Sequence, residues 1–230
     1  MSAGPEVSES VRDAELPGRL LATERDAFMP LLRATPEERF GLRTACPGWT
    51  VRDVLAHCGA ALIRVVEGRL EPGVFSPESN AVDVAERADW PLARVLDELE
   101  RGFTEAGPVI AAAGGPLDPV ALGEWVHAGD VRDAFGVPGA YAGEGAEAAL
   151  DLLVIASRKR GKPLLRADLL DDDGLRDGRS LELGVAADGR APARLTCDVP
   201  TLIRLCTGRS LVGTRYELAG AEEKELSLYA

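Results

Sequence analysis

Two residues one helical turn apart, Glu124 and His127, are the most promising chemical groups in this sequence. They lie in the stretch GEWVHAGDVRDAFG, whose helical spacing places on one face Glu124, His127, Val131 and Phe135. A face expected to pack against a core therefore carries a carboxylate and an imidazole. Burying an unpaired polar group costs about 1–3 kcal/mol, and an unpaired charge costs more. A bound metal ion would offset this cost, whereas the simpler interpretation is a Glu–His hydrogen bond at a half-exposed position.

The only other histidine, His57, lies on a second predicted helix. The segment CPGWTVRD has a Pro-Gly turn followed by Thr50 and Asp53 at the spacing of a capping box, which predicts a helix that starts there and ends near Gly68. Helical counting places His57 on the flank of the apolar stripe, where an exposed side chain is the simpler interpretation. Both histidines nevertheless lie near the middle of a helix and beside small residues, which favours a shared site.

The composition limits the class of protein. The chain has 230 residues, of which 46% are hydrophobic, as in a folded globular protein. Its formal charge of −12 argues against nucleic acid and anionic membranes as partners, because both attract basic surfaces. The first ten residues contain no signal-like segment, no apolar run has the length of a membrane span, and the four cysteines form no C-x-x-C pair. We therefore expect a cytoplasmic protein with reduced thiols.

The N-terminal part is predicted to be helical, since apolar residues recur there at helical spacing. Four helices in the first 140 residues suggest an up-and-down bundle with a site between facing helices. Pro30 predicts a kink or end of the first helix, and Asp89 is expected to cap the third. The four helices are expected at about 11–32, at 51–68, from 89 through at least 103, and at 123–136, with an irregular connection at 71–86 and a small-residue turn at 111–117.

The residue pattern changes after residue 140, where a Gly/Pro-rich linker leads to a fifth helix at 146–157. Short alternating or apolar segments separated by turn residues then predict strands, followed by one more helix. The prediction is an α+β protein with a helical domain at 1–140 and a small α/β domain at 141–230, the fifth helix packing on either. The strands are expected at 164–169, 180–185, 193–197 and 215–218, and the last helix at 199–206.

Three segments, CPGWTVRDVLAHCGA, WVHAGDVRDAFG and DVPTLIRLCTGR, occur in this order and resemble the mycothiol-dependent maleylpyruvate isomerase family. The resemblance covers nearly the whole chain and is most specific at residues 46–60 and 123–136. It implies an N-terminal DinB-like four-helix bundle joined to a smaller C-terminal α/β domain. It also implies a divalent metal, of the zinc type, held by three side chains from two helices, with an open position for a thiol or water.

By this resemblance the metal ligands are His57, His127 and a carboxylate. The family's carboxylate precedes its second histidine by four positions, where this chain has Gly123, and the glutamate follows one position later as Glu124. Because positions three and four residues away are both helical neighbours, Glu124 is the expected third ligand, with Asp130 as the alternative. Two histidines and one carboxylate suit zinc, and an open fourth position is typical of a catalytic site.

The resemblance implies a cofactor thiol, mycothiol, that is held as thiolate and adds to a small electrophilic acid, which is then isomerised or transferred. Arg204, Arg209 and Arg215 could bind a substrate carboxylate, but surface arginines would look the same in the sequence. The competing interpretation is a non-catalytic DinB-like binding or regulatory protein with a degraded metal site, which Gly123 favours and the two histidines oppose. In either case the expected assembly is a monomer or a homodimer.

Overall fold

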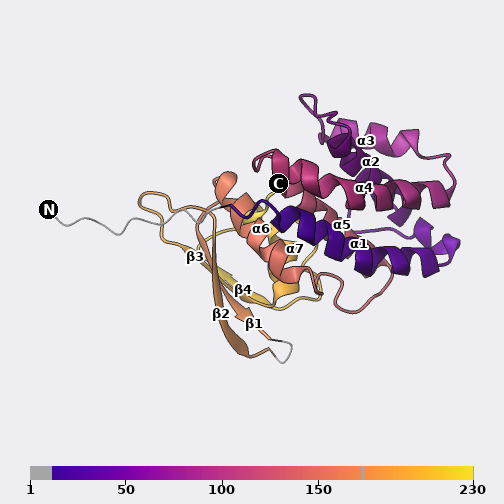
Figure 1. The fold of residues 1–230 in the computed structure, drawn as a ribbon. Coiled ribbons are helices and arrows are strands. Elements are labelled where there is room, and N and C mark those ends of the chain that lie inside the picture. The colour runs from indigo at the N-terminus through magenta and orange to yellow at the C-terminus, as the bar shows by residue number, and fades with distance from the viewer. Residues whose placement is uncertain (1–11, 172–173, 230) are drawn as a thin grey trace.

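The computed structural model describes residues 12–171 and 174–229 and has the predicted α+β class (Figure 1). Long helices form the N-terminal part, and a small sheet with further helices follows. The elements of the first part are α1 (Leu16–Ala34), the 3₁₀ helix η1 (Glu37–Gly41), α2 (Val51–Val66), α3 (Pro77–Glu86), α4 (Leu92–Ala112) and α5 (Asp118–Ala134).

The long helices of this part pack on one another through apolar faces. Helix α4 contacts α1 and α2, and α5 also contacts α1 and α2. The contact between α2 and α4 is close, because a Cβ added at Gly102 would lie 2.5 Å from the Cβ of Leu62. A glycine is therefore required at this crossing. The side chains buried at the centre of these contacts include Phe28, Leu55, Leu62, Leu99, Ile110 and Leu122.

Helix α2 starts as predicted, with a capping box in which Thr50 and Asp53 each accept a hydrogen bond from the other's backbone N–H. Two other predictions about helices are wrong, the cap at Asp89 and an end of the first helix at Pro30. Helix α1 continues through Pro30 to Ala34, because the core contacts of Phe28, Met29 and Leu32 hold the last turn in place. The N-cap of α4 is Pro91 rather than Asp89, and this helix continues to Ala112.

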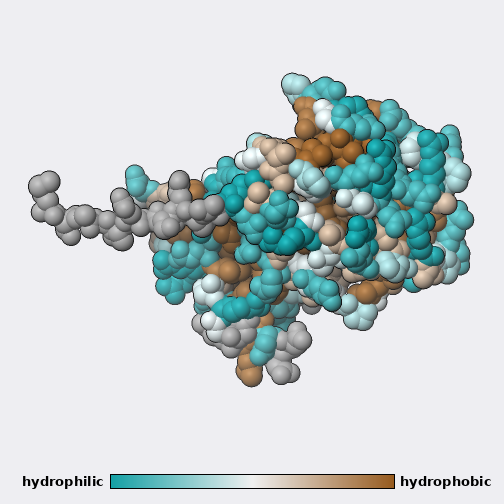
Figure 2. Space-filling model, viewed as in Figure 1, coloured by the Kyte–Doolittle hydropathy of each residue, from teal (hydrophilic) through white to brown (hydrophobic). Residues whose placement is uncertain are grey.

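The segment expected to be an irregular connection contains α3. Its start has the ordinary signals, because the Ser76 hydroxyl accepts a hydrogen bond from the Ser79 N–H and Pro77 occupies the first turn. A buried ion pair fixes α3 to α2, with Arg64 Nη2 2.6 Å from Asp83 Oδ1. Figure 2 shows one face of the whole molecule in the same view as Figure 1. Hydrophilic residues cover most of that face, and hydrophobic residues gather mainly where α2 and α3 lie.

The second part is a four-stranded sheet with helices packed on it. The strand order is β2-β1-β3-β4, in which β1 and β3 are parallel and the other two pairs are antiparallel. The side chains of β1 alternate between buried and more exposed positions, as expected for a strand with one covered face. The elements are α6 (Ala146–Lys159), β1 (Leu165–Leu170), β2 (Arg176–Leu183), β3 (Ala193–Cys197), α7 (Val199–Cys206), β4 (Tyr216–Ala219) and α8 (Glu223–Leu226).

Helix α6 connects the two parts. It contacts α1 and α5 on the helical side, and β2 and α7 on the side of the sheet. The chain segments that follow α6 and α7 thereby lie beside α5, where they take part in the site described next. In the described part of the chain, no helix is both long and apolar enough to span a membrane.

Candidate functional site

A cavity of about 530 Å³ is lined mainly by α2, α5 and segments from the C-terminal part. The three predicted metal ligands, His57, Glu124 and His127, all line it, and so does Gly123. Further lining residues come from the loop before α2, from α3, and from the segments that follow α6, α7 and α8: Cys46, Trp49, Asn80, Arg160, Arg209 and Tyr229.

His57 is buried, with 7% of its surface exposed, and is not the exposed flank residue that helical counting allowed. Its ring lies 5.1 Å from the Trp49 ring and 5.3 Å from the His127 ring, centroid to centroid. Burial, with a smaller effect of His127, lowers the pKa of His57 to about 3, so His57 is neutral at physiological pH. Its Nδ1 atom is buried and has no hydrogen-bond partner. A neutral imidazole with an unused nitrogen is the form that binds metal ions.

Glu124 is also buried, with 3% of its surface exposed, and its Oε2 atom has no hydrogen-bond partner. Burial raises the pKa of Glu124 to about 8, and the neighbouring Cys58 thiol offsets part of this effect. A carboxyl oxygen and an imidazole nitrogen that are buried without partners on one cavity wall are unusual, because buried polar groups are nearly always hydrogen-bonded. A cation bound between them would satisfy both groups, so these residues fit a metal ion.

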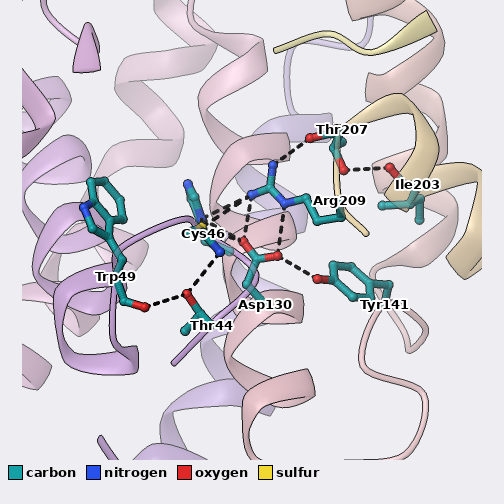
Figure 3. Close-up of polar contacts among 9 residues, drawn as sticks. Thr44, Cys46, Trp49, Asp130, Tyr141, Ile203, Thr207 and Arg209 are labelled. Carbon is teal, nitrogen blue, oxygen red and sulfur yellow. Dashed lines mark hydrogen bonds and ion pairs between the residues drawn. The ribbon is translucent and has the colours of Figure 1, made fainter. Parts of the chain in front are cut away.

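Asp130, the alternative ligand, is fully buried and has many partners (Figure 3). Its Oδ1 accepts hydrogen bonds from the Tyr141 hydroxyl at 2.6 Å and from Arg209 Nε at 3.0 Å. Its Oδ2 accepts from Arg209 Nη2 at 2.7 Å and from the Cys46 thiol at 3.2 Å, and lies 3.1 Å from His127 Nδ1. Burial would raise the pKa of Asp130, but the hydrogen bonds from His127 and Arg209 hold it well below its usual range.

Among the described residues, Cys46, His127 and Asp130 are the one group of three whose metal-binding atoms all lie within 4.8 Å of one another. His57, Glu124 and His127 do not meet that distance as a set, although they share the cavity wall. The tighter group is poorly suited to a cation, because the Arg209 guanidinium already contacts both oxygens of Asp130. Burial, followed by the charge of Asp130, also raises the pKa of Cys46 to about 12, which disfavours the thiolate.

Tyr141 was not anticipated from the sequence, because it lies in the Gly/Pro-rich segment expected to be a linker. Its ring is 1% exposed and packs on Gly129, where an added Cβ would lie 2.5 Å from the ring. The glycine before Asp130 therefore makes room for the tyrosine that donates to Asp130. The sequence offered one signal for this arrangement, a glycine in the middle of a predicted helix.

The three arginines considered as carboxylate-binding residues have different surroundings. Arg209 lines the cavity but is paired with Asp130. Arg204 pairs with Asp133, with 2.8 Å between Nη2 and Oδ1, and Arg215 is exposed and does not line the cavity.

Arg160, at the end of α6, was not anticipated. It lines the cavity, donates a hydrogen bond to the Leu228 carbonyl at 2.7 Å and lies over the Tyr229 ring. Within the described ranges it forms no ion pair, which leaves it as the cavity-lining guanidinium whose charge is not already balanced.

These features define an α+β protein in which two histidines and a carboxyl from two helices line one cavity. A family model, the mycothiol maleylpyruvate isomerase N-terminal domain, matches residues 21–152, more than half of the chain, and the protein belongs to this family.

Two solved structures share its fold: the mycothiol-dependent maleylpyruvate isomerase, and a mutant of it in which a histidine is replaced by alanine. Both superpose with a TM-score of 0.55 over 92% of this chain and 97% of theirs, at 17% identity for the isomerase and 18% for the mutant. No curated protein matches the chain at a significant level.

Proposed function

We propose that the protein is a metal- and thiol-dependent isomerase or transferase that uses mycothiol and acts on a small electrophilic acid. The observation that carries this proposal is the pair of buried atoms without partners, His57 Nδ1 and Glu124 Oε2, on the cavity wall that also contains His127. Membership of the mycothiol maleylpyruvate isomerase N-terminal domain family supports the choice of thiol.

His57, His127 and Glu124 would hold the metal ion, and zinc suits this set of two imidazoles and one carboxylate. The ion would supply a Lewis acid that lowers the pKa of a thiol bound to it. The chain itself contributes a neutral His57 and a buried Glu124, whose charged form the cation would stabilise. The cavity volume lies in the range of small-molecule sites, about 300–1,000 Å³.

An acidic substrate is supported by Arg160. Its guanidinium has donors left after the hydrogen bond to Leu228, and planar guanidinium groups bind carboxylates in a bidentate manner. Trp49 and Tyr229 add aromatic surface to the same cavity. The substrate would thus lie between the Arg160 guanidinium, which binds its carboxylate, and the two histidines.

The first test is metal content and isomerisation of maleylpyruvate in the presence of mycothiol. Wild-type protein should contain close to one zinc per chain, and His57→Ala and His127→Ala should each lose zinc and activity while helix content stays near that of the wild type. Glu124→Gln should weaken zinc binding by at least about tenfold. Glu147→Gln is its matched control and should not, because Glu147 is a surface residue whose partner is Arg179. Full zinc occupancy in both histidine variants would refute the proposed ligands.

The non-catalytic alternative, a binding or regulatory protein, is based on Gly123. If it is correct, protein purified without chelators contains no metal, and mycothiol with maleylpyruvate gives no product even after zinc is added. Metal binding together with turnover would exclude it.

A further inference from the structure

We propose that Asp130 and Arg209 are positioning residues for His127, and that they fix the imidazole in the tautomer that carries hydrogen on Nδ1 and a free lone pair on Nε2. Asp130 acts on the ring directly, and Arg209 acts by holding Asp130. The consequence for metal binding rests on the proposed function, whereas the tautomer itself does not.

The contacts of Nδ1 support this tautomer. The nearest polar atom is Asp130 Oδ2 at 3.1 Å, and an ionised carboxylate can only accept, so Nδ1 must carry the hydrogen. Two donors, Arg209 Nη2 and Cys46 Sγ, also lie 3.5 Å from Nδ1 and could donate to a lone pair there. Both are better placed toward Asp130, at 2.7 Å and 3.2 Å, so they do not compete for the ring nitrogen.

Asp130 is held by groups that leave it little freedom. Arg209 donates to both of its oxygens, and the buried Tyr141 hydroxyl donates to Oδ1. These donors require the ionised carboxylate, since a carboxylic acid would present its own hydrogen to one of them. The carboxylate is thus fixed in charge and in orientation before any ligand binds to His127.

Arg209 reaches this position from the C-terminal part of the chain (Figure 3). It follows α7, and its Nη1 donates to the Thr207 carbonyl at 2.8 Å, while the Thr207 hydroxyl donates to Ile203 at 2.7 Å. Gly208 lies between Thr207 and Arg209 and has a positive φ of 71°. A Cβ added at Gly208 would lie 3.0 Å from Ser227 Oγ. The turn that places Arg209 is therefore specific, and the site in the helical part is incomplete without it.

The chain offers a matched control for this contact. Asp133 lies one turn beyond Asp130 on the same helix and also pairs with an arginine of the C-terminal part, Arg204. Asp133 is 46% exposed at its side chain, whereas Asp130 is 0% exposed, and no contact links Asp133 to His127. Asp133→Asn removes an ion pair between the same two segments without touching the imidazole.

The decisive measurement is ¹⁵N NMR of the imidazole nitrogens in metal-free protein at pH 7.5. The chain contains two histidines, so His57→Ala assigns the His127 signals directly. Wild-type protein and Asp133→Asn should show a protonated Nδ1 and an unprotonated Nε2. Asp130→Asn should shift His127 toward the opposite tautomer or a mixture. Arg209→Met should cause a smaller shift, because Asp130 keeps its charge and loses only the contacts that orient it, and Arg209→Lys should restore the wild-type pattern in part.

Zinc affinity provides the second measurement. It should fall about 10–100-fold in Asp130→Asn and Arg209→Met, the range found when a partner of a ligating histidine is lost, and stay within twofold in Asp133→Asn. An unchanged tautomer in Asp130→Asn and Arg209→Met would overturn the inference, whether or not the protein binds zinc. The expected tautomer changes in a protein that binds no zinc would support the inference and refute the proposed function. If Asp130→Asn does not fold, Arg209→Met and Arg209→Lys carry the same test.

Discussion

Replacing Glu124 by glutamine should stabilise the metal-free protein and weaken the metal-loaded one. The side chain is 3% exposed, Oε2 has no partner, and burial raises the pKa of Glu124 to about 8 from an ordinary value of 4.5. Because the folded pKa lies above the unfolded one, the folded state holds the proton more tightly. The favourable contribution of the Glu124 carboxyl to the free energy of unfolding is fully present below pH 4.5 and is lost progressively as the pH rises to about 8.

The size of the effect follows from the same shift. Each pH unit between the two pKa values costs about 1.36 kcal/mol, so the carboxyl lowers the free energy of unfolding by about 3 kcal/mol at pH 7. Glutamine has the same shape and does not titrate. The difference between Glu124→Gln and wild type should therefore be near zero at pH 4.5, about 3 kcal/mol at pH 7 and largest above pH 8.

The assay is urea unfolding at several pH values, first with a chelator and then with excess zinc. Bound zinc stabilises a folded protein according to its affinity, by about 2.7 kcal/mol at a hundred times the Kd. A tenfold loss of affinity in Glu124→Gln removes about 1.4 kcal/mol of this. Glu147→Gln should show neither effect. If Glu124→Gln destabilises the metal-free protein equally at every pH, Oε2 has a hydrogen-bond partner that glutamine cannot replace, and the argument for a cation beside this oxygen fails.

Two further predictions concern the cavity and the thiols. Arg160→Met should raise the KM for an acidic substrate about tenfold, with a smaller change in kcat. Arg158→Met removes an exposed arginine two residues away and should not raise the KM. Equal KM values in both variants would place the substrate carboxylate elsewhere. All four cysteines should react with a thiol reagent in denatured, unreduced protein, and a thiol blocked until reductant is added would contradict this prediction. In the native protein Cys46 should react first, since it is partly exposed while the other three cysteines, Cys58, Cys197 and Cys206, are buried.

The sequence predicted the fold class because most elements have strong local signals. The capping box before α2 and the alternating strands needed no tertiary information. Helix α3 was missed, although Ser76 and Pro77 mark its start, because its short apolar pattern is weak. Its position depends on the ion pair between Arg64 and Asp83, which links residues far apart in sequence and has no local signal.

The candidate site was harder to predict because α5 is buried on several sides. It packs against α1, α2 and α6, so helical counting could not separate an inward face from an outward one. Asp130 is fully buried, and two of its partners come from later in the chain. Arg209 lies 79 residues further on, and Tyr141 lies in a segment without periodicity. Spacing on one helix cannot reveal such contacts.

The balance of charge favours Glu124 over Asp130 as the third ligand. The negative charge of Asp130 is matched by Arg209, and a divalent ion at Asp130 would have to approach that guanidinium closely. No cation contacts Glu124 Oε2 among the described residues, so a positive ion there is stabilised without competition. The two nitrogens of His127 point to opposite sides of the ring, which allows Nε2 to bind an ion while Nδ1 contacts Asp130. Asp130 would then lie between the arginine and the metal, an anion that separates two cations.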